Sequence, residues 1–217
     1  MTVEREKQLA AEAAAQLVED GMLVGLGTGS TVAYLLPALA ARGLSLRCVA
    51  SSPATERAAR ELGIKVESFC GPGSVSRLDI TIDGADQVAR SGWLVKGGGG
   101  AHTREKAIAA ATDRFVVIVS SNKLVETLTP PVPLELLKFG LAATLQRLDT
   151  VRLRDVSPSP EGGVIADFTG PFEDPEVLAA RLSSTVGVVQ HGLFAPDLVS
   201  DVVVARGEEV ERIALTA

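Results

Sequence analysis

Apolar residues recur along the first two-thirds of the chain with two alternating periods. Residues 4–19 place Leu9, Ala13 and Leu17 on one face at helical spacing, and residues 22–26 form a short apolar run typical of a buried strand. The same alternation predicts further strands over 46–50, 64–69, 78–82, 93–95 and 115–119, and further helices over 32–42, 53–62 and 103–112. Short apolar strands that alternate with helices predict an α/β fold with a doubly wound, mostly parallel, Rossmann-like sheet.

The order of elements changes after residue 129, where four residues, 130–133, include three prolines. The pattern then predicts strand 134–136, helix 139–148, strand 151–156, strand 164–168, a helix that Asp174 caps and Pro175 opens, and strand 186–194. This β-α-β-β-α-β order is typical of a smaller ferredoxin-like α+β domain. Two further strands over 201–205 and 210–215 could return to the first domain. The predicted domains are therefore residues 1–129 plus 204–217, and residues 130–203.

Composition narrows the possible partners and location. Hydrophobic residues make up 46% of the 217 residues and aromatic residues only 4%, so the core must be built from Ala, Val, Leu and Ile. The formal net charge of −6 argues against a nucleic-acid surface, although a single phosphate needs only a few local donors. No apolar run approaches the ~18 residues of a membrane span, and the N-terminal segment lacks the apolar stretch of a signal peptide. Cys48 and Cys70 have no metal-ligand spacing, so we expect a protein of the reducing cytoplasm without a membrane contact.

The glycine-rich segment Gly25–Thr31, with sequence GLGTGST, follows a predicted strand and opens a predicted helix. Backbone N–H groups converge at such a turn, and the helix dipole favours an anion there. Ser30 stands where the third glycine of a dinucleotide fingerprint would fall, and no Gly-Lys-Ser/Thr of a P-loop follows. We interpret the turn as a phosphate-binding site; the alternative is a purely structural turn with Ser30 or Thr31 as the helix cap.

Two further segments follow predicted strands and therefore lie at the same edge of a parallel sheet. The first is 83–86, with sequence DGAD, whose two carboxylates could face one pocket; in isolation, a solvated Asx-type turn is the simpler interpretation. The second is 96–100, with sequence KGGGG. Four consecutive glycines are entropically costly to order, and a flexible linker is a poor alternative because strand and helix signals flank the run. We expect a backbone function here, with Lys96 supplying a cation.

Glu105 falls in the first turn of the helix for which Thr103 is the predicted N-cap. The positive end of the helix dipole favours an ionised carboxylate, which is what a general base requires, although glutamate is common in first turns for structural reasons alone. His102 and His191 have no ligand partner at metal spacing, so no metal site and no cofactor is expected. We interpret His102 as a surface or pocket-wall residue.

Together these segments resemble ribose-5-phosphate isomerase of the A type. The resemblance rests on GLGTGST at 25–31, SSPATE at 51–56, DGAD at 83–86 and KGGGGAHTREK at 96–106, and it extends to SNK at 121–123, PVPLE at 131–135 and GLF at 192–194. These motifs cover nearly the whole chain. The family interconverts ribose 5-phosphate and ribulose 5-phosphate without a metal in the pentose phosphate pathway, and it forms dimers or tetramers. The resemblance therefore implies an isomerase that acts on a sugar phosphate as a homodimer or homotetramer.

The resemblance also implies residue roles. Glu105 matches the catalytic base, which moves a proton between C2 and C1 through a cis-enediolate, and Asp83 is the expected assistant of ring opening. Asp86 and Lys96 are further catalytic candidates. The implied substrate-binding residues are Thr28, Gly29, Ser30, Thr31, Asp83, Gly84, Ala85, Asp86, Lys96, Gly97, Gly98, Gly99, Lys123 and Lys7.

The chain departs from the family pattern at Gln87, Gly100 and His102, which affects the shape of the pocket rather than the reaction class. One alternative function is a non-catalytic sugar-phosphate-sensing module, which would have no need of Glu105 and usually accompanies a basic DNA-binding segment. A second is an amino-sugar phosphate isomerase or deaminase, against which the 96–106 segment argues.

Overall fold

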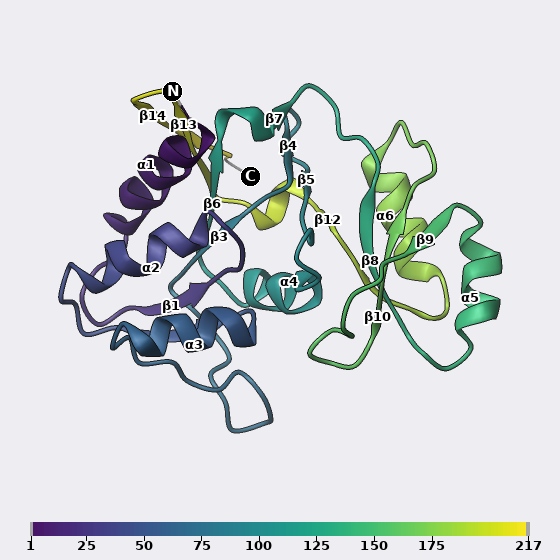
Figure 1. Cartoon of the computed structure of the whole chain (residues 1–217), viewed down its shortest axis with the longest axis horizontal. Coiled ribbons are helices and arrows are strands. Elements are labelled where there is room, and N and C mark those ends of the chain that lie inside the picture. Colours follow the sequence, from purple (N-terminus) through teal and green to yellow (C-terminus); the bar gives the residue numbers. More distant parts are fainter. Residues whose placement is uncertain (1, 216–217) are drawn as a thin grey trace. The chain divides into compact units, whose positions relative to one another are not determined.

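The computed structural model describes residues 2–215, which form two compact units (Figure 1). The first comprises residues 1–85, 104–124 and 197–217, and the second comprises residues 86–103 and 125–196. Residue 1 and residues 216–217, which the predicted first domain includes, lie outside the described residues. The units interleave in the chain more than the predicted domains do, because short strands within 86–103 pair with a strand near residue 194.

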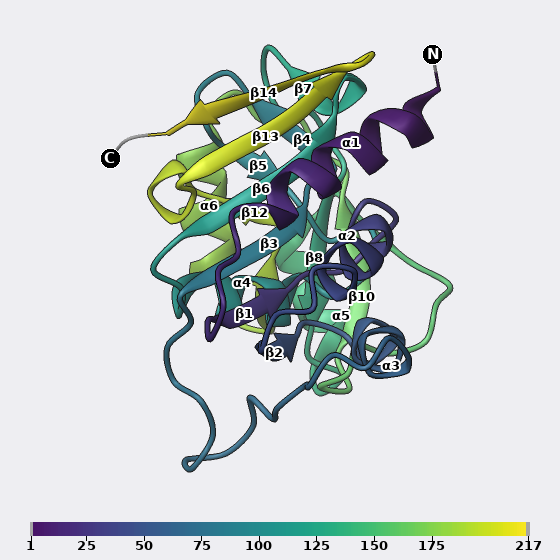
Figure 2. The ribbon, with the colours of Figure 1, turned by 90° about the vertical axis from the view of Figure 1, so that its left-hand side faces the viewer.

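The first unit is built on a six-stranded sheet in the order β14-β13-β6-β3-β1-β2, which Figure 2 shows from top to bottom. Its strands are β1 (Leu23–Leu26), β2 (Arg47–Ala50), β3 (Ile80–Gly84), β6 (Phe115–Ser120), β13 (Asp201–Arg206) and β14 (Glu209–Ala214). All neighbours pair in parallel except β13 and β14, which form an antiparallel hairpin at one edge. The predicted doubly wound, mostly parallel sheet is confirmed.

Helices cover both faces of this sheet. They are α1 (Val3–Ala15), α2 (Val32–Ala40), α3 (Pro53–Glu61) and α4 (His102–Ala110). α1 and α2 pack on one face through a shared core, in which small alanines of α1 allow a close approach to the strands. Ile108 of α4 packs on the opposite face, against Val49 and Leu78. Ser52 caps α3 by accepting a hydrogen bond from Thr55 N at 3.1 Å.

The strand order places a topological switch point beside β1. The chain passes from β1 through α2 to β2 on one side, and β3 then pairs with β1 on the other side. In open α/β sheets, ligands bind outside the carboxyl ends of the strands at such a point. The segments that follow β1 and end β3 are therefore placed where a ligand site is expected.

The second unit contains a four-stranded antiparallel sheet in the order β11-β8-β10-β9. Its strands are β8 (Val132–Leu136), β9 (Val151–Leu153), β10 (Val164–Phe168) and β11 (Val188–His191), and its helices are α5 (Leu141–Leu148) and α6 (Pro175–Ser184). Numbered within this unit, the order is 4-1-3-2, which agrees with the predicted split βαβ, ferredoxin-like arrangement. A separate small sheet has the order β12-β5-β4-β7, formed by β12 (Leu193–Phe194), β5 (Leu94–Val95), β4 (Gln87–Ala89) and β7 (Leu124–Val125).

Three predicted strands are wrong in extent, and one of them, 151–156, forms a strand only over residues 151–153. Residues 64–69 pair with β2 only through a single bridge between Val66 and Cys48, because the chain then enters a loop with Gly71 and Gly73. The predicted strand 186–194 is divided into β11 and β12 at Gly192, where a Cβ atom would lie 2.1 Å from Lys96 O. None of the helices within residues 2–215 is long and apolar enough to span a membrane.

Candidate active site

The turn after β1 packs directly on Asp83 at the end of β3. Gly27 N donates a hydrogen bond to Ile82 O at 3.0 Å, and Thr28 N donates one to Asp83 Oδ1 at 2.9 Å. A Cβ atom on residue 27 would lie 1.9 Å from the same Asp83 oxygen, so the close approach of the two segments requires glycine. Asp83 is only 1% exposed. Two segments that the sequence predicts to share one edge of the sheet are therefore in contact.

Hydroxyl groups from the start of α3 support this turn. Thr28 Oγ1 lies 2.8 Å from Ser51 Oγ and 3.2 Å from Thr55 Oγ1, and Thr55 Oγ1 donates to Gly27 O at 2.9 Å. The resemblance includes the SSPATE segment but implies no role for it. Its place beside the turn follows from the pairing of β2 with β1, which brings the residues that follow the two strands together.

The N-terminus of α2 lacks a side-chain cap of its own. Thr31 precedes α2 with helical backbone angles and makes no capping hydrogen bond, and Gly29 has a left-handed φ of 117°. The first turn of a helix presents N–H groups that a side chain, water or an anion must satisfy. Thr31 therefore does not act as a hydrogen-bonding cap, which was one form of the structural alternative, and the phosphate interpretation of the turn stays a prediction.

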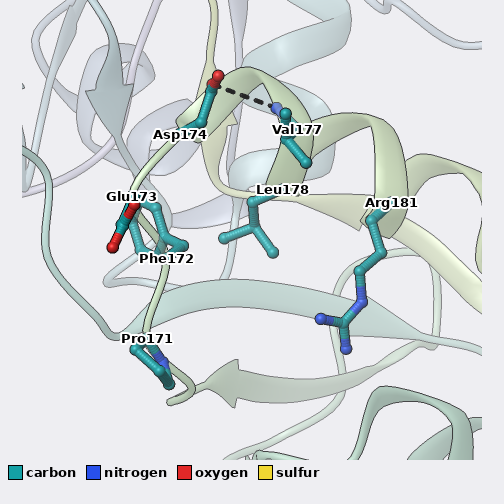
Figure 3. Close-up of a pocket in the computed structure, with 7 residues that line it drawn as sticks. All are labelled: Pro171, Phe172, Glu173, Asp174, Val177, Leu178 and Arg181. Atoms are coloured by element: carbon teal, nitrogen blue, oxygen red, sulfur yellow. Dashed lines mark hydrogen bonds between the residues drawn. The ribbon is translucent and has the colours of Figure 1, made fainter.

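At the N-terminus of α6, in the second unit, a side chain does cap the helix (Figure 3). Asp174 Oδ1 accepts hydrogen bonds from Glu176 N at 2.8 Å and Val177 N at 3.3 Å, so its own carboxylate occupies the anion position. A cavity of about 480 Å³ lies beside it. Seven residues line this cavity, namely Pro171, Phe172, Glu173, Asp174, Val177, Leu178 and Arg181, and none of them is a predicted site residue.

Lys7 lies close to the first turn of α2. Its Nζ donates to Glu4 Oε1 at 2.7 Å, and the hydroxyl of Tyr34, on that first turn, donates to Glu4 Oε2 at 2.9 Å. Glu4 thus joins the lysine to the helix that follows the glycine-rich turn. This placement is compatible with the predicted phosphate-side role of Lys7.

Lys123 closes the short 3₁₀ helix η1 (Ser121–Lys123) after β6. Glu6 of α1 holds this segment, because its Oε2 accepts from Ser121 N at 2.9 Å and Ser121 Oγ at 2.8 Å, and its Oε1 accepts from Gly207 N at 2.9 Å. The Gly207 bond, followed by the Ser121 side-chain bond, lowers the pKa of Glu6 below its ordinary value. No sequence signal singles out Glu6, because its partners are 115 and 201 residues away.

Glu105 lies in the first turn of α4 and is 5% exposed. Thr103 is not the N-cap that the sequence predicts, because α4 already begins at His102. Its hydroxyl instead donates a short hydrogen bond to the buried carboxylate of Glu135 on β8, which also accepts from Ser159 Oγ. Thr103 and Glu135 therefore form a contact within the second unit.

Lys106, next to Glu105, offers a test of stability against pH. Burial lowers the pKa of Lys106 to about 7 from 10.5. Between these values the unfolded chain binds more protons than the folded chain, so this residue makes stability rise with pH up to about 10. We expect Lys106→Met to raise the melting temperature at pH 7 by at least about 2 °C and to lose that advantage near pH 10. Thermal unfolding of both proteins at the two pH values measures this; an advantage independent of pH would contradict it.

The second unit brings Asp86 and the glycine run together. Gly98 N donates to Asp86 Oδ2 at 2.7 Å, and Lys96 N donates to Gly192 O at 2.8 Å. Lys96 is 2% exposed, and its Nζ lies 5.4 Å from the centroid of the Phe194 ring. A cation over an aromatic face is stabilised by the ring quadrupole. Phe194 of the GLF segment, for which the resemblance implies no role, thus supports Lys96.

The backbone of the glycine run requires glycine, as its sequence predicts. Gly97 has a φ of 102°, and a Cβ atom there would lie 2.7 Å from Nδ1 of His102. His102 itself is fully buried, so the surface interpretation of this histidine is wrong and it forms a wall behind the run. Gly99 and Gly98 are exposed.

Each unit thus assembles part of the predicted set. The first brings Thr28 into contact with Asp83, and it carries Lys7 on α1, Glu105 on α4 and Lys123 on η1. The second brings Asp86 into contact with the glycine run that follows Lys96. Within residues 2–215, no three His, Cys, Asp or Glu side chains gather in a way that could hold a metal ion.

Known proteins match the chain over nearly all of its length. A family model described as ribose 5-phosphate isomerase A (phosphoriboisomerase A) matches residues 47–209. Ribose-5-phosphate isomerase A of Caulobacter vibrioides is 42% identical over 98% of this chain and 99% of its own, and that of Lacticaseibacillus paracasei is 43% identical over 91% of each.

Solved structures agree with these matches. Ribose 5-phosphate isomerase A from Neisseria gonorrhoeae is 30% identical and superposes with a TM-score of 0.93 over 100% of this chain and 99% of its own. A D-ribose-5-phosphate isomerase in complex with phospho-erythronic acid is 33% identical, with a TM-score of 0.91 over 99% of this chain and all of its own. The chain therefore belongs to the ribose-5-phosphate isomerase A family.

Proposed function

We propose that this chain interconverts ribose 5-phosphate and ribulose 5-phosphate by proton transfer through a cis-enediolate. The observation that carries the proposal is the buried carboxylate of Glu105 in the first turn of α4. Removal of a proton next to a carbonyl needs an ionised base and hydrogen-bond donors for the enediolate oxygen. The N-terminal end of α4 favours the ionised form of such a base.

The reaction divides into ring opening and isomerisation of the open-chain sugar. In ring opening, Asp83 takes the proton from the hydroxyl on C1 of the furanose and delivers it to the ring oxygen O4, which breaks the C1–O4 bond and gives the aldehyde. Glu105 then takes the proton from C2, and the electron pair moves to O1. Transfer of a proton from O2 to O1, and return of the proton from Glu105 to C1, completes the ketose. Atoms and charges balance without a metal.

The same proposal assigns the phosphate to the uncapped start of α2, with Thr28 to Thr31 as donors and Lys7 and Lys123 as nearby cations. Gly84, Ala85 and Asp86 would contact sugar hydroxyls, as would Lys96 to Gly99. The complex of the solved relative with phospho-erythronic acid supports this substrate class. That acid carries a planar carboxylate in place of the charged end of an enediolate.

The proposal also covers the cellular location and the assembly state of the chain. We expect the chain to act in the cytoplasm as a homodimer or homotetramer, and these expectations rest on the family resemblance. Sedimentation of the purified protein gives its assembly state directly.

The direct test of the proposed function follows ketose formation from ribose 5-phosphate in the presence of EDTA. We expect turnover at a rate within the usual enzyme range of ~1–10³ s⁻¹ and no loss when EDTA is added. Binding of ribose 5-phosphate without turnover would replace this proposal by the sugar-phosphate-sensing module.

A further inference from the structure

Arg154, which follows β9, contacts two separate parts of the second unit with one guanidinium group. Its Nε and Nη2 donate to the two carboxylate oxygens of Asp167 at 3.0 and 2.6 Å. Its Nη1 donates to Gly97 O at 3.1 Å and to Gly98 O at 2.8 Å. The residue thus links β10, which carries Asp167, to the glycine run at 97–98.

The contact with Asp167 holds the guanidinium group of Arg154 in one orientation. Asp167 is 3% exposed, and a planar guanidinium that binds a carboxylate through two parallel bonds cannot rotate without breaking one of them. Burial raises the pKa of Asp167, but hydrogen bonds and charge from Arg154, and less strongly from Arg152, outweigh this and leave the pKa below its ordinary value. The Nη1 group therefore has a fixed direction toward the glycine run.

A planar trans peptide then determines where the opposite N–H groups point. The peptide bonds after Gly97 and Gly98 are trans, so each N–H points away from the carbonyl that Arg154 binds. Gly98 N–H goes to Asp86 Oδ2 at 2.7 Å. Gly99 N–H makes no hydrogen bond to any group of residues 2–215, and Gly99 is exposed. The geometry presents one backbone donor to solvent on the side away from Arg154.

We propose that Arg154 is a positioning residue for the isomerase reaction, which fixes the Gly97–Gly98 carbonyls so that Gly99 N–H faces the bound sugar. The expected effect on catalysis rests on the proposed function. A backbone donor that needs no reorganisation stabilises the charge that develops on an enediolate oxygen more than it stabilises the neutral sugar. Loss of Arg154 therefore lowers kcat more than it changes KM.

The test compares Arg154→Ala with Arg152→Ala. Arg152 Nη2 also lies within 3.4 Å of Asp167 Oδ2, but its side chain is 71% exposed and it does not contact the glycine run, so it is a matched control. We expect Arg154→Ala to lower kcat at least about tenfold with a KM within about threefold of the wild type, since small misplacement of a catalytic donor has large kinetic effects. Arg152→Ala should remain close to the wild type. Added guanidinium ion should restore part of the lost kcat of Arg154→Ala alone.

A second readout does not depend on turnover. Amide hydrogen exchange of the peptide that contains residues 97–101 should accelerate in Arg154→Ala and stay unchanged in Arg152→Ala. Equal kcat and equal exchange in the two variants would overturn the role of Arg154. Absence of wild-type turnover would instead overturn the proposed function, and the exchange comparison would still decide whether Arg154 holds the glycine run.

Discussion

Glu105→Gln is expected to abolish most of the conversion of ribose 5-phosphate while the protein stays folded. Glutamine has the shape of glutamate but cannot accept the C2 proton, and general acid–base catalysis contributes about 10²–10⁴-fold. The side chain is almost fully buried in the first turn of α4, so the substitution removes the charge without opening a cavity. Steady-state kinetics should show a fall in kcat of at least about 10²-fold with little change in KM.

The control for this experiment is Glu176→Gln, which alters another first-turn glutamate, at the exposed start of α6. It should leave kinetics and binding unchanged. Phospho-erythronic acid, the ligand of the solved relative, provides a binding probe that does not require turnover. If Glu105→Gln bound this acid as the wild type does and also isomerised ribose 5-phosphate at a near-normal rate, Glu105 would not be the base.

Most elements of both units could be predicted because their signals are local, whereas the short strands β4 and β7 are absent from the sequence prediction. Helical spacing of apolar residues locates α1, and Ser52 before Pro53 locates the start of α3. The sequence predicts a mostly parallel sheet but not the order of its strands, because pairing in a parallel sheet joins segments far apart in the chain. The strand expected over 64–69 shows the limit, because its composition suits a strand but only Val66 finds a partner.

In the candidate site, too, some residues have local sequence signals and others do not. Motifs such as GLGTGST carry their chemistry within seven residues, so their place at strand ends could be read directly. Supporting residues carry no such signal: Arg154 lies 56 residues from Gly98, and Thr103 lies 32 residues from Glu135. Thr103 has the composition of an N-cap, but its hydroxyl serves a tertiary contact instead. Sequence patterns thus indicate candidate residues for the chemistry, and the fold determines which residues hold these candidates in place.

Asp83→Asn should separate ring opening from the proton transfer between C1 and C2. Asp83 Oδ1 accepts hydrogen bonds from Thr28 N at 2.9 Å and Gly84 N at 2.7 Å. The amide oxygen of asparagine accepts both, so the turn after β1 keeps its shape, but the second oxygen becomes an NH₂ group that cannot take a proton. We expect conversion of ribose 5-phosphate to fall by about 10²-fold.

Ribulose 5-phosphate distinguishes the two steps, because its O5 is esterified and it cannot close a furanose ring. In D₂O, a base that removes and returns a proton at C1 introduces deuterium into ribulose 5-phosphate without any ring chemistry. Asp83→Asn should keep this exchange within about threefold of the wild-type rate, whereas Glu105→Gln should lose it together with turnover. If Asp83→Asn lost exchange and conversion to the same extent, Asp83 would act in the enediolate step or in binding. The opposite responses of the two carboxylates to one substrate therefore decide which of them opens the ring and which of them moves the carbon-bound proton.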